Sequence, residues 1–330
     1  MYDFIALGDT ATDVFIRLEE DSQAKIEGEP GTPNYRISLP FTAKIPYSDS
    51  ITISGVGNAP NASVSVATLG LRSALIAHVG EDEPGRETIE SLKKRGVETK
   101  FITIESGKHT NYSYLLWYKN DRTILRRNEK FNYVLPDFGT PSWVYVSSIG
   151  SDTLDVYENL ASSLKQNPEI KLAFQPGSKE IPLGMKLSSL YERADIYFSN
   201  VEEAETILGI NTLGIEELLK RFKELGPKIV VITDGPKGAY AYDGKDMYHQ
   251  LPYPDPKPPL ERTGAGDAFS STTTGALAMG KSLPEAMQWG AINSMSVVQY
   301  VGGQEGLLNK EQIEEYLKKA PKEFETKKLN

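Results

Sequence analysis

The stretch that decides the fold reads Glu261-Arg262-Thr263-Gly264-Ala265-Gly266-Asp267-Ala268-Phe269. Its three consecutive small residues leave backbone N–H groups unobstructed where a helix is expected to begin, and the helix dipole adds positive charge there. Such a nest can hold the oxygens of a transferring phosphoryl group, and a carboxylate beside it can accept a hydroxyl proton. The same residues also suit a tight turn with an aspartate cap. The small residues that follow, and the position late in the chain, favour the first interpretation.

Around this stretch, strands and helices alternate in the sequence from about residue 142 onward. Strong apolar runs such as 228–233 read as buried strands, and helices are expected at 264–279, 283–298 and 310–318. This alternation predicts an α/β fold with a doubly wound, mostly parallel sheet and helices on both faces.

The earlier part of the chain has a different pattern. Residues 101–104, 112–118 and 123–127 alternate like antiparallel strands, and they predict a small separate sheet. Residues 19–34 are polar and rich in glycine and proline, which is typical of a mobile excursion, and the lysine-rich 322–330 is expected to fray. We therefore expect an α/β body made of residues 1–11, 56–97 and 131–330, and a discontinuous β lid made of residues 12–55 and 98–130.

Bulk composition excludes several classes of function. The net charge of −9 argues against nucleic acid as a partner, since nucleic-acid binders carry basic faces. The absence of cysteine excludes disulfides and thiolate sites, and the three histidines are not spaced as a metal pair. The start of the chain is wrong for a secretory signal, and no apolar run approaches the ~18 residues of a membrane span. We expect a cytoplasmic protein without a membrane partner.

Thr263 to Phe269 resembles the C-terminal signature of the ribokinase-like (pfkB) carbohydrate kinase family. The resemblance implies a ribokinase-like fold with a small β-sheet lid, ATP with Mg²⁺ as the phosphoryl donor, and a homodimer formed through the lid. It implies that Asp267 is the catalytic base and that Gly264, Ala265 and Gly266 form the anion hole. Glu261 stands where relatives carry an aspartate that helps to bind a monovalent cation, so the resemblance also implies a K⁺ site there.

Two further motifs resemble the acceptor half of such a kinase. Gly57-Asn58-Ala59-Pro60-Asn61 resembles the family's N-terminal Gly-Gly-x-x-x-Asn signature, with Val56 in place of one glycine. The resemblance implies that Gly57, Asn58 and Asn61 hold acceptor hydroxyls. Asp13 matches the family's aspartate that binds two substrate hydroxyls. We expect Asp13 and Asn61 to come from two different strand–helix junctions that a parallel sheet brings to the same edge.

The nucleotide half carries weaker motifs. Asn200-Val201-Glu202-Glu203 resembles the Asn-x-x-Glu motif, which implies that Asn200 lies near the nucleotide and that Glu203 contacts magnesium through water. The same residues also read as a helix capping box. Further nucleotide-binding residues implied by the resemblance are Thr233, Gly235, Gly238 and Asn293. Gln175-Pro176-Gly177-Ser178 departs from the Asp-Pro-Asn that is common in relatives.

The acceptor stays open between a sugar, a sugar phosphate and a nucleoside. Tyr112, Tyr114, Trp117 and Tyr118 could stack on a nucleobase or simply pack the lid. A sugar- or nucleotide-binding sensor would be expected to lack Asp267, and a dehydrogenase would be expected to carry Gly-x-Gly-x-x-Gly after its first strand.

Overall fold

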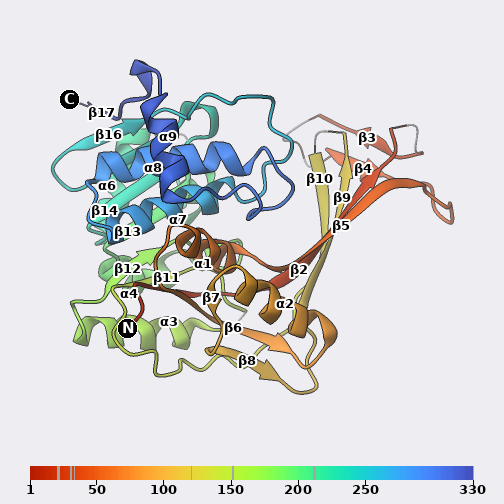
Figure 1. Cartoon of the computed structure of the whole chain (residues 1–330), viewed down its shortest axis with the longest axis horizontal. Helices are drawn as coiled ribbons and strands as arrows, with labels where there is room; N and C mark the ends of the chain where they lie inside the picture. Colours follow the sequence, from red (N-terminus) through yellow and green to blue (C-terminus); the bar gives the residue numbers. More distant parts are fainter. Residues whose placement is uncertain are drawn as a thin grey trace.

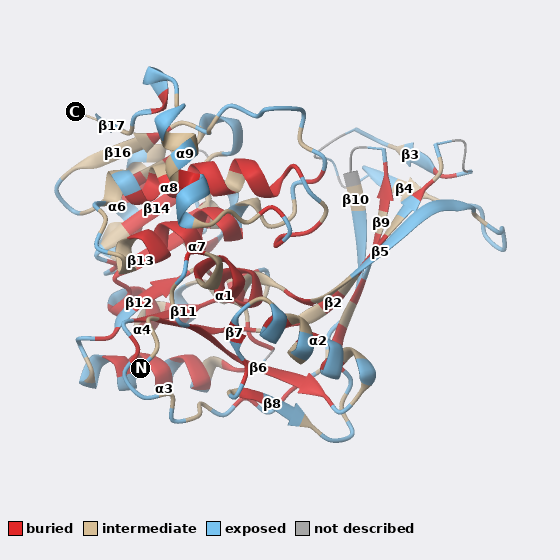
Figure 2. Ribbon diagram, in the orientation of Figure 1, coloured by how far each residue is buried: buried red, intermediate tan, exposed pale blue. Residues whose placement is uncertain are grey.

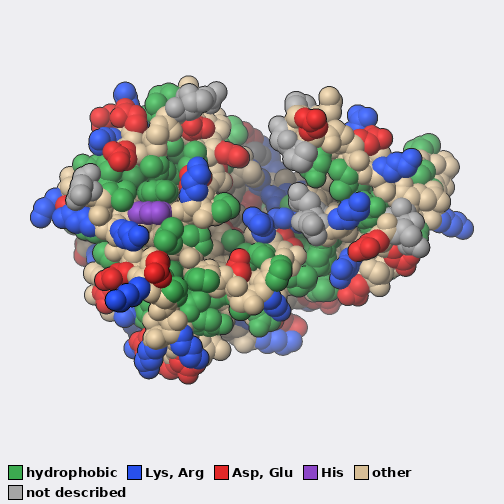
Figure 3. Space-filling model, turned by 90° about the horizontal axis from the view of Figure 1, so that it is seen from above, with side chains coloured by type: hydrophobic (Ala, Val, Ile, Leu, Met, Phe, Trp, Pro, Cys, Tyr) green, Lys and Arg blue, Asp and Glu red, His purple; other side chains and the backbone are tan. Residues whose placement is uncertain are grey.

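The computed structural model describes residues 1–20, 23–29, 32, 34–119, 121–150, 152–210 and 213–329. Over this part of the chain, an α/β body carries a smaller sheet at one side (Figure 1). Seen from above, the smaller sheet forms a second lobe, with a hollow between the two lobes (Figure 3). None of the helices in the described ranges is long and apolar enough to cross a bilayer.

The body is built on an eleven-stranded sheet. Its strands in spatial order are β17 (Lys327–Leu329), β16 (Met247–Gln250), β15 (Ala239–Tyr242), β14 (Ile229–Thr233), β13 (Ile196–Asn200), β12 (Lys171–Phe174), β11 (Trp143–Val146), β1 (Phe4–Leu7), β6 (Ser73–Gly80) and β7 (Val97–Glu98), with β8 (Ile102–Glu105) paired to β6. The pairs from β14 to β8 are parallel, and β15 to β17 are antiparallel. The predicted mostly parallel sheet is confirmed.

Helices cover both faces of this sheet because its central strands are apolar on both sides (Figure 1). The helices are α1 (Asn58–Thr68), α2 (Glu83–Lys94), α3 (Leu154–Gln166), α4 (Ser188–Arg193), α5 (Val201–Leu208), α6 (Ile215–Glu224), α7 (Ala265–Ala278), α8 (Leu283–Val297) and α9 (Lys310–Lys318), with short 3₁₀ turns η1 (Ile181–Leu187), η2 (Gly235–Lys237) and η3 (Lys322–Phe324). One core cluster lies under α1, α7 and α8, and the other lies under α3 to α6. Helix α7 is buried from Asp267 to Ala276 (Figure 2).

The lid sheet has four strands, in the order β10 (Asp121–Arg127), β9 (Asn111–Tyr118), β2 (Ala11–Leu18) and β5 (Tyr47–Val56). Strands β2 and β9 run parallel, and the other neighbours run antiparallel. A separate two-stranded sheet joins β3 (Lys25–Glu27) to β4 (Arg36–Ser38). Because residues directly opposite in a sheet point to the same side, the register places Asp13, Ser113 and Arg126 on one face of the lid.

Two expectations about the chain differ from the structure, and a third falls partly outside the described residues. Strand β8, expected in the lid, pairs with β6 of the body, because the long buried β6 needs a partner for its second half from Ala77 to Gly80. The C-terminal segment is not frayed: Phe324 is 2% exposed in the core, and β17 pairs with β16. The polar excursion at 19–34 falls partly on residues 21, 22, 30, 31 and 33, which lie outside the described residues, and its described part includes β3.

Candidate active site

The site is built at the carboxyl edge of the parallel strands, where loops of an open α/β sheet form ligand crevices. Residue Gly8 follows β1, Gln175 follows β12, and the last residues of β13 and β14 lie opposite each other in register at Asn200 and Thr233. The start of α7 reaches the same edge, because the carboxylate of Asp267 contacts the side chain of Gln175.

The Asp267 side chain lies in the first turn of α7 and is held by three amides. Its Oδ1 accepts a hydrogen bond from Asn58 Nδ2 at 2.8 Å, and its Oδ2 accepts one from Asn61 Nδ2 at 2.9 Å. Gln175 Nε2 lies 3.3 Å from Oδ1. The structure therefore brings together the expected base and both expected asparagines, and it adds Gln175.

Burial sets the basicity of this carboxylate. Only 8% of Asp267 is exposed, and desolvation raises its pKa, while the hydrogen bonds from Asn61, Asn58 and Gln175 oppose that rise. A carboxylate that is more basic than a solvated aspartate accepts a hydroxyl proton more readily. The amides also fix the orientation of the carboxylate.

The turn before Asp267 exposes backbone amides. Gly264 is the N-cap of α7 with a φ of +80°, and a Cβ there would lie 2.4 Å from Gly303 Cα. The first strong helical bond of α7 runs from Ala268 N to Gly264 O at 2.8 Å. The amides of Gly266 and Asp267 precede it, and first-turn amides have no helical carbonyl to bind. The geometry can therefore receive an anion beside the Asp267 carboxylate.

Asp13 reaches the site from the lid rather than from a strand–helix junction, so that part of the sequence interpretation is wrong. It lies within β2, on the same face as Arg126. Burial raises the pKa of Asp13, and the neighbouring charges of Arg126, Glu261 and Arg122 also act on it. Because Glu261 belongs to the body, this face of the lid looks toward the body.

Glu261 is occupied by protein groups. Arg122 Nη1 of lid strand β10 lies 3.1 Å from Glu261 Oε1, and the same oxygen accepts hydrogen bonds from Thr263 N at 2.9 Å and Thr263 Oγ1 at 2.7 Å. The Glu261 side chain is 3% exposed. A guanidinium therefore supplies positive charge at Oε1, whereas the buried Oε2 has no hydrogen-bond partner among the described residues.

The predicted capping box at Asn200 and Glu203 is present. Asn200 Oδ1 accepts from Glu203 N at 2.8 Å, and Asn200 N donates to Glu203 Oε2 at 2.9 Å. Burial is the largest cause of a raised pKa at Glu203, and the charge of Asp267 also contributes. The two carboxylates therefore lie close enough for the charge of one to influence the other. No group of three or more acidic or histidine side chains in the described ranges forms a metal cage.

Other expected nucleotide residues lie in two different settings. Thr233 ends β14, and the following turn needs glycine, because Gly238 has a φ of +93° and a Cβ there would lie 2.1 Å from Gln250 O. Gly235 opens the same turn with a φ of +48°. Asn293 is fully buried, and its amide contacts Thr272 Oγ1 at 2.7 Å and Leu308 N at 2.9 Å. The structure places Asn293 in the core rather than at a ligand surface.

Two glutamines contact the predicted site residues, and neither was assigned a role from the sequence. Gln175 contacts Asp267 directly, and its Oε1 accepts from Ser270 Oγ at 2.6 Å. Gln304 contacts Asn61 from the loop after α8. Two signals were available for Gln175: it directly follows a predicted strand, and it stands where relatives carry Asp-Pro-Asn.

The pfkB family carbohydrate kinase model matches residues 37–310 of the chain. The chain belongs to this family. The ATP-dependent 6-phosphofructokinase of Thermoanaerobacterium thermosaccharolyticum is 23% identical over 263 residues, which cover 74% of this chain and 79% of the relative.

Two solved structures share the fold of this pfkB family carbohydrate kinase. The ribokinase of Arabidopsis thaliana, complexed with ribose and ATP, superposes with a TM-score of 0.78 at 19% identity, covering 96% of this chain and 99% of the other. The nucleoside kinase of Methanocaldococcus jannaschii superposes with a TM-score of 0.74 at 20% identity, covering 96% of this chain and 98% of the other. The expected ribokinase-like fold is confirmed.

Proposed function

We propose that this carbohydrate kinase transfers the γ-phosphate of ATP to a hydroxyl of a sugar or sugar derivative, with Asp267 as the catalytic base. The observation that carries the proposal is the buried Asp267 carboxylate, fixed by Asn58 and Asn61 beside the first-turn amides of α7. A positioned nucleophile, a base and an anion hole are the elements that phosphoryl transfer requires.

In this mechanism the acceptor hydroxyl lies between Asp267 and the γ-phosphorus. As the new O–P bond forms, the hydroxyl proton passes to Asp267, and the bond from phosphorus to the β–γ bridging oxygen of ATP breaks. The amides of Gly264, Ala265 and Gly266 stabilise the charge on the transferring group. Mg²⁺ bound with ATP would neutralise phosphate charge, and Glu203 with Asn200 would hold its coordinated waters.

We assign the acceptor side to Asp13 on the lid and to Gly57, Asn58 and Asn61 at the start of α1. Gly57 has a φ of +128°, and a Cβ there would lie 2.9 Å from Asp9 O. A carboxylate together with amide groups suits a pair of vicinal hydroxyls, because a carboxylate accepts hydrogen bonds from hydroxyls and an amide can both donate and accept them. We assign the ATP side to Asn200, Thr233, Gly235 and Gly238 at the ends of β13 and β14.

The nature of the acceptor is tested by a coupled ADP-release assay with ATP and a panel of neutral sugars, sugar phosphates and nucleosides. The relatives act on more than one of these classes by name, since one is a 6-phosphofructokinase and another a nucleoside kinase. A sugar or sugar phosphate should give acceptor-dependent ADP release. Turnover of nucleosides alone would favour the nucleoside kinase alternative, and ligand binding without any turnover would favour a sensor.

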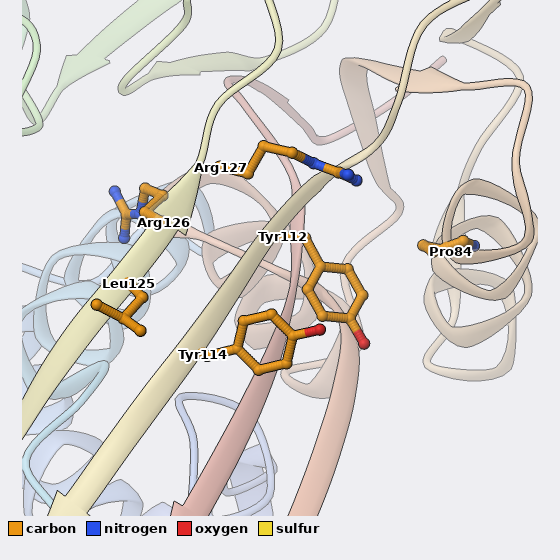
Figure 4. Close-up of a pocket in the computed structure, with 6 residues that line it drawn as sticks. All are labelled: Pro84, Tyr112, Tyr114, Leu125, Arg126 and Arg127. Carbon is orange, nitrogen blue, oxygen red and sulfur yellow. The ribbon is translucent and has the colours of Figure 1, made fainter. Parts of the chain in front are cut away.

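We also propose that the chain forms a homodimer through the outer face of the lid. Tyr112, Tyr114 and Leu125 lie on the lid face opposite to Asp13 and Arg126. They line a cavity of about 390 Å³ together with Pro84 of α2, Arg126 and Arg127, and Figure 4 shows Arg126 and Arg127 on opposite sides of β10. Tyr114 is 47% exposed and Leu125 is 53% exposed, an apolar surface that a second copy would cover. Sedimentation of Leu125→Asp beside the parent protein tests this, since the variant should be monomeric.

A further inference from the structure

Gln304 is a buried side chain that reaches the Asp267 carboxylate through one intermediate residue. It is 3% exposed, and its Nε2 donates to Gly55 O at 2.8 Å and to Asn61 Oδ1 at 2.9 Å. Asn61, 5% exposed, in turn donates from Nδ2 to Asp267 Oδ2 at 2.9 Å. Two hydrogen bonds in series therefore join the loop after α8 to the carboxylate.

The direction of this chain is fixed by the Gly55 carbonyl. A backbone carbonyl can only accept, so the Gln304 atom that faces it must be the NH₂ group. The same NH₂ faces Asn61, and Asn61 must therefore turn its carbonyl oxygen toward Gln304. Once its oxygen is used there, the Asn61 NH₂ group points to Asp267.

The surrounding backbone leaves little room for another arrangement. A Cβ at Gly303 would lie 2.7 Å from Asn61 Nδ2, and a Cβ at Gly264 would lie 2.4 Å from Gly303 Cα. The loop that carries Gln304 thus packs against both Asn61 and the turn that begins α7. Gly55 lies in β5, so the chain is also tied to the root of the lid.

We propose that Gln304 is a positioning residue: anchored by the Gly55 carbonyl, it orients the Asn61 amide so that this amide donates to Asp267. The functional consequence of this inference rests on the proposed role of Asp267 as the base. The hydrogen-bond direction itself does not, and it can be tested without any substrate.

The decisive variant is Gln304→Glu, which keeps the shape of the side chain and replaces the donor by an acceptor. An ionised glutamate attracts the Asn61 NH₂ group, and the Asn61 amide then turns its oxygen toward Asp267. The carboxylate loses a donor and gains a repulsive oxygen, so the pKa of Asp267 rises by roughly one unit, which corresponds to a tenfold change in its proton affinity.

The readout is a carboxyl ¹³C titration of the ligand-free protein labelled at aspartate, with the Asp267 signal identified by its loss in Asp267→Asn. Other titratable groups that face Asp267 are Tyr145 of β11 and Glu203 of α5. Both are the same in all the proteins compared, so a difference between the titrations reports on residue 304.

Gln250→Glu is the matched control. Gln250 is fully buried on β16, and its Nε2 also donates to two backbone carbonyls, Leu251 O and Phe324 O, both at 2.9 Å. The control loses its donor in the same way and should leave the Asp267 titration unchanged.

With the acceptor found in the panel, Gln304→Glu should also move the acid limb of the kcat profile to higher pH, with the KM for ATP nearly unchanged.

An Asp267 titration in Gln304→Glu that superimposes on that of the parent protein would overturn the proposal. If this variant fails to fold, Gln304→Met takes its place, because it removes the donor without adding a charge. The pKa of Asp267 should then rise by a smaller amount than in Gln304→Glu. An unchanged pKa of Asp267 in Gln304→Met would refute the proposal. A normal kcat in Asp267→Asn would instead refute the proposed base and leave the orienting role of Gln304 intact.

Discussion

Arg122 and Glu261 join the lid to the turn before the anion hole, and breaking this ion pair should destabilise the protein. The Glu261 side chain is 3% exposed and that of Arg122 is 25% exposed. Removing one partner of a buried pair costs about 3–5 kcal/mol, because the other charge stays buried. Glu261 keeps its hydrogen bonds from Thr263, so Arg122→Gln should lower the free energy of unfolding by about 2–3 kcal/mol.

The reverse change should cost less. In Glu261→Gln the guanidinium of Arg122 is left at the lid edge, where a quarter of its side chain already meets water, and about 1 kcal/mol should be lost. The double variant Arg122→Gln/Glu261→Gln removes both charges of this ion pair together, so it should be more stable than the sum of the single changes predicts, by about 1–2 kcal/mol.

Urea unfolding of the four proteins gives this coupling energy directly. Lys44→Gln serves as the control, because Lys44 is exposed between β4 and β5 and has no ion pair with the described residues. The control should stay within about 0.5 kcal/mol of the parent. If the destabilisations of the two single variants sum to that of the double variant within about 0.5 kcal/mol, Arg122 and Glu261 are energetically independent, which contradicts the pairing.

Three further predictions address the base, the turn and the C-terminus. Burial raises the pKa of Asp267 above the ordinary 3.8, and the base must be ionised, so kcat should fall as pH drops through that raised pKa and level off above it; a pH-independent kcat down to pH 4 would contradict this. Gly264→Ala should lower the free energy of unfolding in urea by at least about 1 kcal/mol more than Gly280→Ala. Both glycines have a positive φ, which costs an alanine roughly 1–2 kcal/mol, but only the Cβ at 264 would clash with Gly303 Cα. Phe324→Ala should cost about 3–5 kcal/mol in the same experiment, whereas a frayed C-terminus would give almost no change.

Features with local causes could be predicted from the sequence. Small residues followed by Asp267 predict a helix start with free amides, and α7 begins at Ala265 as expected. The spacing of Asn200 and Glu203 predicts a capping box, and both of its hydrogen bonds are present. Alternating strands and helices after residue 142 predict the parallel half of the sheet. Each of these patterns is complete within a short segment of chain.

The remaining features depend on which distant segments meet. Strand β8 is exposed along half of its length like a lid strand, and only the unpaired half of β6 explains its place in the body. Gln304 is 243 residues away from Asn61 in the sequence, and Arg122 meets Glu261 only because the lid packs over the body. An amide or a guanidinium alone carries no signal for such partners, so the support of Asp267 could not be predicted.

The kcat of Asp267→Asn, measured with ATP and the acceptor found in the panel, tests the role of Asp267 most directly. Asparagine keeps the shape and the helix position but cannot accept the proton. The kcat should therefore fall by about 100-fold or more, with the KM for ATP nearly unchanged. A folded Asp267→Asn enzyme with near-normal kcat would contradict the assignment of Asp267 as the base.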